Sequence, residues 1–395
     1  MGRRKVYCGE MSEAPSSRLK FLGVETFGEG MASWHHSVSE LLVLSAVLKV
    51  SFVEPCVAKG KLSMKNCALG GAPLRTVFDI EVMRSISPKI VPYADYANES
   101  LQRESLCMYH YTHGCGILPT IHSSNETCPA ALANRDVDAI EFLEYRREGL
   151  EGIDLDTLKE ANEKLAFAPA HFAIANLIVG ALGFDADEHD YVAYQWRSEL
   201  HHKNATQCAK ALIASKDFLV KGNQTVVLVT DLTDVRAHQW GGIRDYDDDV
   251  MKQVLKELYD SNFRKPILDD VDTVHRILDD LATSDTSVNA DRHLLGPETT
   301  NDATKKTNDV DMVYLAIWDA IIAANAKTLG TCQDCVKDPI CRDCMWQKHF
   351  VELVVTLRHQ QARLKGFKDD TYTCWPSTPQ IQDDFRKRSQ IPPLE

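Results

Sequence analysis

Short runs of β-forming residues alternate with longer helical segments through much of the chain. The runs at residues 191–194 and 224–232 are rich in aromatic and β-branched residues, which suit buried strands. The segment 247–262 has an amphipathic helical pattern, and 310–331 reads as an apolar helix followed by a short strand. This alternation predicts an α/β fold built on parallel sheets.

The length of 395 residues is enough for two domains. A well-delimited helix is expected over 169–184, with Pro169 in its first turn and Gly183 just after its end. We therefore predict an N-terminal domain over 1–184, a C-terminal domain over 185–370 and a tail over 371–395. Residues 55–150 are expected to be largely irregular, with a turn and a strand within 67–81.

A glycine-containing loop over 24–37, "VETFGEGMASWHHS", precedes a segment that is apolar on nearly all sides and reads as a buried helix. The strand-like run "VSFVEP" follows. A glycine loop, a helix and a strand in this order are typical of the opening of a nucleotide-binding α/β domain.

The strand over 191–194 is followed by a charged residue, Arg197. In open α/β sheets, ligands bind at the carboxyl ends of the strands. The planar guanidinium group is suited to a bidentate grip on a phosphate. The alternative is a surface arginine that pairs with Glu199.

Four clustered cysteines, Cys332, Cys335, Cys341 and Cys344, form two CxxC pairs. This pattern is compatible with zinc, although the gap between the pairs is short. Two disulfides or free thiols are the alternatives. The acidic residues 247–249 are explained by a helix N-terminus as well as by a metal. The doublets His35–His36 and His201–His202 are read as loop histidines that are more often solvated than metal-bound.

The net charge of −13 argues against nucleic acid as a partner. The first 21 residues have a basic start but no apolar core of a signal peptide, which favours either a cytoplasmic protein or an incomplete N-terminus. Twelve cysteines favour instead the secretory pathway, in the lumen of the ER or Golgi. So do four glycosylation sequons, at Asn98, Asn125, Asn204 and Asn223.

Several segments, taken in order, resemble the GDP-fucose protein O-fucosyltransferase superfamily over about residues 22–365. They are residues 28–55, 191–199, 226–232, 313–332 and 349–360. The first is similar to the family's glycine loop with the helix and strand that follow it. The second is similar to the family's His-x-Arg strand, and the third to its strand that ends in Thr-Asp. The last two are similar to its Asp-centred helix with a short strand, and to its final helix.

The chain departs from this family pattern at three places. Gln195 stands where the family usually has histidine, and Ser33 stands near a usual asparagine. His349 and Phe350 replace a Ser/Thr-Phe pair, directly after the inserted cysteines.

The resemblance implies a GT-B-like architecture of two Rossmann-like domains that face a nucleotide-sugar cleft, with the acceptor on the N-terminal side. It implies inverting transfer of fucose from GDP-fucose to a hydroxyl of a protein or glycan, without a metal. Arg197 would meet the charge of the leaving diphosphate, and Glu29 would be the catalytic base, unless it is an ordinary loop carboxylate. The donor-binding candidates are Gly28, Gly30, Ser33, Gln195, Asp231, Asp319, Lys348, His349 and Phe350.

Two other functions are compatible with the sequence. Gln195 and the changed loop after Cys344 are compatible with a catalytically inactive GT-B-like protein that binds a glycan or a nucleotide. The clustered cysteines and the absent signal peptide are compatible with a cytoplasmic, zinc-stabilised binding protein. The acceptor and the oligomeric state do not follow from the sequence.

Overall fold

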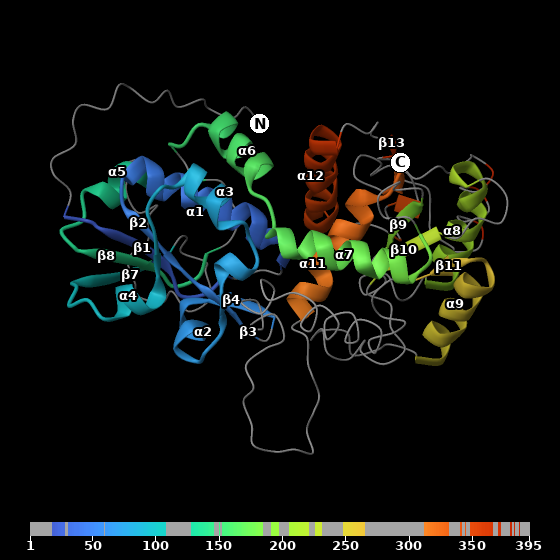
Figure 1. The fold of residues 1–395 in the computed structure, drawn as a ribbon, viewed down its shortest axis with the longest axis horizontal. Helices are drawn as coiled ribbons and strands as arrows, with labels where there is room; N and C mark the ends of the chain where they lie inside the picture. The colour runs from blue at the N-terminus through green and yellow to red at the C-terminus, as the bar shows by residue number, and fades with distance from the viewer. Residues whose placement is uncertain are drawn as a thin grey trace, which may run out of the picture. The chain divides into compact units, whose positions relative to one another are not determined.

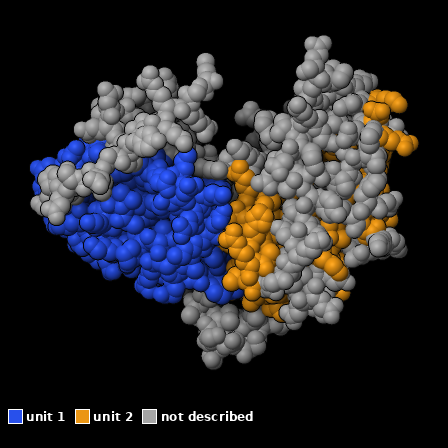
Figure 2. Space-filling view, turned by 90° about the horizontal axis from the view of Figure 1, so that it is seen from above, with its two compact units in different colours: residues 1–169, 286–315 blue, residues 170–285, 316–395 orange. Residues whose placement is uncertain are grey.

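The computed structural model describes residues 18–27, 31–58, 60–107, 128–145, 150, 152–184, 191–196, 205–220, 226–230, 248–264, 312–331, 340, 341, 344, 348–365, 370–372, 380, 383 and 387. The chain divides into two compact units, residues 1–169 with 286–315 and residues 170–285 with 316–395 (Figure 2). Each unit contains its own parallel sheet with helices around it (Figure 1). The domain limits at 184/185 and 370/371 stay a prediction.

The first unit is built on a five-stranded sheet in the order β6-β2-β1-β8-β7, and its strand pairs are all parallel. The strands are β1 (Phe21–Val24), β2 (Ser51–Glu54), β6 (Ile90–Pro92), β7 (Arg103–Leu106) and β8 (Ala139–Phe142). A small antiparallel sheet, in the order β4-β3-β5, combines Lys61–Ser63, Cys56–Ala58 and Ala72–Pro73.

The helices of the first unit lie on both sides of its large sheet (Figure 1). They are α1 (Met31–Leu48), α2 (Met64–Ala68), α3 (Ile80–Ile86), α4 (Tyr93–Ala97), α5 (Cys128–Ala133) and α6 (Leu155–Lys164), with a 3-10 turn at Leu74–Thr76. α1 is buried along nearly its whole length because α3, α5 and α6 surround it on one side of the sheet. This explains why its sequence is apolar on almost every face.

The second unit is built on a five-stranded parallel sheet in the order β11-β10-β9-β12-β13. The strands are β9 (Val192–Trp196), β10 (Val226–Thr230), β11 (Phe263–Arg264), β12 (Thr328–Gly330) and β13 (Asp370–Tyr372). The helices are α7 (Pro169–Ala181), α8 (Ala205–Leu219), α9 (Asp248–Asp260), α11 (Met312–Asn325, in this unit from Ala316) and α12 (Lys348–Lys365). Taken by their place in the chain, these strands have the Rossmann-type order 3-2-1-4-5.

The two faces of β9 pack against different partners. Val192, Tyr194 and Trp196 share one core cluster with residues of α8 and α9. On the other face, the hydroxyl of Tyr191 donates a hydrogen bond to the carbonyl oxygen of Ile322, at 2.7 Å. Burial on both faces explains why the strand reads as a continuous β-forming run without polar alternation.

One buried arginine supports the end of α11. Arg358 of α12 is 0% exposed, and its guanidinium donates to the carbonyl oxygens of Ala324, Ala326 and Lys327. These carbonyls lie at and just after the C-terminus of α11, where a helix leaves acceptors unpaired. The charge of Arg358 is therefore met by backbone dipoles.

The α/β expectation is confirmed, with two Rossmann-like parallel sheets. The expected helix at 169–184 is α7, and Gly183 follows it with φ +83°. The expectation of an irregular 55–150 is wrong, because strands β3 to β8 and helices α2 to α5 lie there. Within 67–81 the turn leads to β5, a 3-10 turn and the start of α3, and no long strand forms. No helix in the described parts of the chain is long and apolar enough to cross a membrane.

Candidate functional site

The carboxyl end of β9 lies at the topological switch point of the second sheet. β10 follows β9 in the chain and pairs on one side of it, whereas β12 pairs on the other side. Crossovers therefore leave in opposite directions from β9 and β12, which is the arrangement at which open α/β sheets bind ligands. Gln195 and Trp196 are the last residues of β9. Arg197 comes next, and it lies outside the described residues.

Three side chains at this switch point have buried polar atoms without a hydrogen-bond partner among the described residues, and one of these atoms is Nε1 of Trp196. Gln195 is 1% exposed, and neither its Oε1 nor its Nε2 atom is paired there. Thr331, which directly follows β12, is also 1% exposed, and its Oγ1 atom is likewise unpaired. Gln195 was a donor-binding candidate from its sequence position, whereas Thr331 was not. The signal for Thr331 was its place directly after the short strand that precedes the cysteine cluster.

Other expected donor-binding residues of the second unit have different surroundings. Lys348 and His349 begin α12, but their side chains are not described. Phe350 is 9% exposed and belongs to the core. Asp319 is half-buried on α11, between the buried residues Trp318 and Ala320. Asp231 directly follows β10 and lies outside the described residues.

The cysteines near this site form disulfides. Cys344 is bonded to Cys208 of α8, and Cys341 is also disulfide-bonded. Oxidised sulfurs offer no thiolate to zinc, so a site made by Cys332, Cys335, Cys341 and Cys344 together does not fit. The expectation of two disulfides within the cluster is wrong for Cys344, because α8 brings its partner from far away in the sequence. The described residues contain no group of side chains arranged to hold a metal.

The carboxyl end of β1 is the corresponding switch point in the first sheet. β1 pairs with β2 on one side and with β8 on the other. The chain then continues through the glycine loop, from here on residues 28–30, into α1. This helix begins at Met31, so the expectation of a loop as far as residue 37 is wrong. Gly28, Glu29 and Gly30 lie outside the described residues. Ser33 lies in the first turn of α1 and is 4% exposed.

Tyr145 contacts the chain on both sides of the glycine loop. Its backbone N–H donates to the carbonyl oxygen of Thr26, before the loop, at 2.9 Å. Its hydroxyl donates to Oε2 of Glu40, after the loop, at 3.1 Å. Tyr145 is 0% exposed and Glu40 is 7% exposed, so this polar contact is buried. The two ends of the glycine loop are thereby held to the region just after β8.

A carboxylate close to the loop was not nominated from the sequence. Glu25 directly follows β1, and its Oε2 atom lies 2.7 Å from Nζ of Lys65. Its backbone N–H donates to the carbonyl oxygen of Phe142 at 2.7 Å, and its own carbonyl accepts from the hydroxyl of Ser63. Its position at the end of a parallel strand was the available signal.

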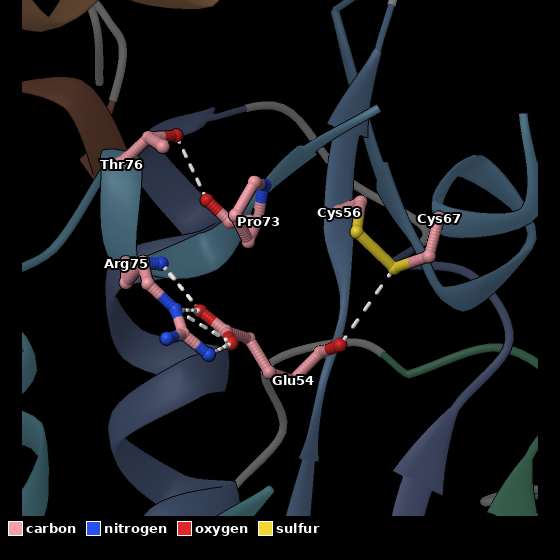
Figure 3. A network of polar contacts seen from close by, with 6 residues as sticks. All are labelled: Glu54, Cys56, Cys67, Pro73, Arg75 and Thr76. Carbon is pink, nitrogen blue, oxygen red and sulfur yellow. Dashed lines mark hydrogen bonds and ion pairs between the residues drawn. A yellow bond between two sulfur atoms is a disulfide. The ribbon is translucent and has the colours of Figure 1, made fainter. Parts of the chain in front are cut away.

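The carboxyl end of β2 carries a buried ion pair (Figure 3). Glu54 is 1% exposed and accepts hydrogen bonds from the guanidinium and the backbone N–H of Arg75. The carboxylate raises the pKa of Arg75 above its ordinary value. Beside the pair, the disulfide Cys56–Cys67 joins β3 to α2. This network fixes the antiparallel sheet against the end of β2.

His35 is a buried residue of α1 and not a solvated loop histidine. Its Nε2 atom lies 2.8 Å from the carbonyl oxygen of Leu165, and its Nδ1 atom lies 2.9 Å from Oδ1 of Asn162. The rings of Phe78 and Phe167 contact it. Burial lowers the pKa of His35, so the ring is held neutral in the core.

Comparisons with known proteins give a likeness of fold alone. No family model matches the chain. No curated protein matches it either. A crystal structure of POFUT1 in complex with GDP has a TM-score of 0.48 and 8% sequence identity, covering 90% of this chain and 99% of that one. A structure of POFUT1 in complex with GDP-fucose has a TM-score of 0.45 and 10% identity, covering 93% and 99%.

Proposed function

We propose that the chain is a glycosyltransferase that transfers fucose from GDP-fucose, with inversion, to a hydroxyl of a protein or glycan. The observation that carries this proposal is where the family-like segments lie in the fold. The glycine loop follows β1 at one switch point, and residues 194–196 of the "YQWR" segment end β9 at the other. Switch points of this kind are where α/β sheets bind nucleotides.

The chemistry assigned to the second switch point is stabilisation of a leaving diphosphate. Breaking the bond between sugar and phosphate leaves negative charge, which fixed cationic and dipolar donors can meet without a metal. Arg197 directly follows β9 and would supply a bidentate cation. The N-terminus of α12, at Lys348 to Phe350, would add backbone N–H donors. Gln195, Asp231 and Asp319 complete the proposed donor-binding set on this unit.

The chemistry assigned to the first switch point is activation of the acceptor. Glu29 would accept the proton of the attacking hydroxyl, as a base in the glycine loop. Gly28, Gly30 and Ser33 would surround it. The contacts of Tyr145 to both sides of this loop support the proposal, because a base must be held in a fixed position to work.

The secretory pathway is the proposed compartment. Disulfides form and persist in oxidising compartments, and the described residues include the bonds Cys56–Cys67 and Cys208–Cys344. The sequon residue Asn98, at the end of α4, is exposed and therefore accessible to glycosylation. Both features support a glycoprotein that matures in the lumen of the ER or Golgi.

A second candidate function is binding without turnover. Gln195 favours it, because an amide cannot carry the charge that a histidine could carry at the same position. Such a protein would still bind a nucleotide or a glycan at the same switch point. The discriminating property is slow hydrolysis of the donor, which an enzyme performs and a silent binding protein does not.

The test is a thermal-shift panel with GDP, UDP, CMP and ADP, each with and without EDTA, followed by a GDP-release assay with GDP-fucose. A ligand that binds only the folded state stabilises it by about 2.7 kcal/mol at a hundredfold excess over Kd. We expect a GDP-selective shift that survives EDTA, together with slow release of GDP. A thermal shift with GDP but no release of GDP from GDP-fucose favours the protein that binds without turnover. The absence of a thermal shift with any nucleotide contradicts both proposals.

A further inference from the structure

We infer that Gln195 and Thr331 form a neutral pair of hydrogen-bonding groups that binds the diphosphate of a nucleoside diphosphate. This inference rests on the proposed function, since it names the groups that contact the ligand at the second switch point. It adds Thr331, which neither the sequence motifs nor the family resemblance assigns to binding.

The register of the sheet brings the two residues together. β12 pairs with β9 through Thr328↔Val192, Leu329↔Ala193 and Gly330↔Tyr194. Continued by one residue, this register places Thr331 beside Gln195. Paired residues on neighbouring parallel strands project to the same side of a sheet. Both side chains therefore belong to one face, at the carboxyl ends of two adjacent strands.

The burial of these groups requires a partner. Both residues are 1% exposed, and their polar atoms have no hydrogen-bond partner within the described part of the chain. Buried polar groups in native proteins are almost always paired, and an unpaired one is costly. A ligand that hydrogen-bonds to both residues would supply the missing partners of these two neighbouring side chains.

The chemistry of the pair selects an anion with several oxygens. The hydroxyl of Thr331 and the amide Nε2 of Gln195 are both hydrogen-bond donors. A diphosphate presents acceptor oxygens to both at once. The same ligand would extend to the cation of Arg197, two residues after Gln195 in the chain. The amide Oε1 of Gln195 remains available to accept from a hydroxyl of the ligand.

A buried water molecule is the competing partner for these groups. Native proteins contain such waters, and they usually bond otherwise unpaired buried polar atoms. The two cases differ in the response to an isosteric apolar substitution. If a ligand completes the pair, Thr331→Val weakens ligand binding and does not destabilise the free protein. If a structural water completes it, Thr331→Val destabilises the free protein and leaves ligand binding unchanged.

The experiment measures Kd for GDP by calorimetry and the urea midpoint without ligand, for the full chain and four variants. Thr331→Val and Gln195→Met remove the proposed donors at nearly constant volume, whereas Thr331→Ser keeps the hydroxyl. Thr328→Val is the matched control, because it makes the same change at the opposite end of β12.

We expect Thr331→Val and Gln195→Met each to raise Kd about tenfold, the effect of one lost hydrogen bond, without lowering the urea midpoint. Thr331→Ser and Thr328→Val should bind GDP as the unmodified chain does. The inference is overturned if the unmodified chain binds GDP and Thr331→Val and Gln195→Met bind it equally well. If the unmodified chain binds no GDP, the proposed function fails and this assignment fails with it.

Discussion

The Nε atom of Arg75 lies 3.0 Å from each carboxylate oxygen of Glu54, and the backbone N–H of Arg75 donates to the same carboxylate at 2.7 Å. Glu54 is the last residue of β2, and Arg75 lies in the 3-10 turn after β5. A carboxylate that is 1% exposed is thus satisfied by one residue through two kinds of donor.

Arg75→Met should destabilise the first unit by roughly 2–3 kcal/mol, because it leaves the buried carboxylate of Glu54 without its cation. This loss of unfolding free energy is smaller than that expected on breaking a fully buried ion pair, because the side chain of Arg75 is 40% exposed. Urea unfolding measures the change. Arg84→Met, which removes the exposed ion pair with Glu81, is the matched control and should cost less than about 1 kcal/mol. Equal effects of the two variants would contradict the assigned role of Glu54.

Tyr145→Phe should lower stability by about 1–2 kcal/mol, because it removes the buried hydrogen bond to Glu40. The backbone bond to Thr26 remains, so the chain before the glycine loop keeps its contact. If the glycine loop carries the base, kcat should fall while KM for the donor stays nearly constant. A variant with unchanged stability and unchanged kcat would show that the contact has no role in holding the loop.

The buried ring of His35 predicts a pH dependence of stability. Its pKa is lowered below 6.5 in the folded state by burial, so the unfolded chain gains a proton first as the pH falls. Stability should therefore decrease below about pH 6.5, with a slope of up to about 1.4 kcal/mol per pH unit. His35→Gln should reduce this slope in urea titrations between pH 5 and 8.

Arg197→Ala should abolish turnover more than it weakens donor binding, because the proposed guanidinium meets charge that develops in the transition state. An arginine in this role contributes on the order of 10³ in rate. Arg197→Lys should not restore activity, since a lysine lacks the planar fork. Steady-state kinetics and GDP calorimetry separate the two effects. Near-normal turnover in Arg197→Ala would remove this residue from the mechanism.

Much of the second unit could be predicted from its sequence. β9, β10, α9, α11 and α12 all fall on runs whose hydrophobic pattern has a clear period or is continuously apolar. The secondary structure of the first unit was harder to predict between residues 55 and 150. Its strands β3 to β7 have only two to four residues each, too short for a period to be recognised.

Gln195 and Arg197 could be nominated from the sequence because they lie at the end of a strand that the sequence predicts, and their roles stay a prediction. Thr331 was missed because the lack of a partner depends on burial, which a sequence does not show. Cys344 was misassigned for a related reason. Its partner Cys208 is 136 residues away, so only the packing of α8 brings the sulfurs together. His35 reads like a loop histidine until α6 and the chain after it cover the ring.

The central position of β9 has a consequence for biosynthesis. β9 pairs with β10 on one side, but its other partner, β12, begins at Thr328. While the ribosome makes the chain between them, one edge of an apolar strand has no neighbour. Such an edge can pair wrongly with other chains. This edge of β9 therefore stays open to wrong pairing until the segment that carries β12 has been made and pairs with it.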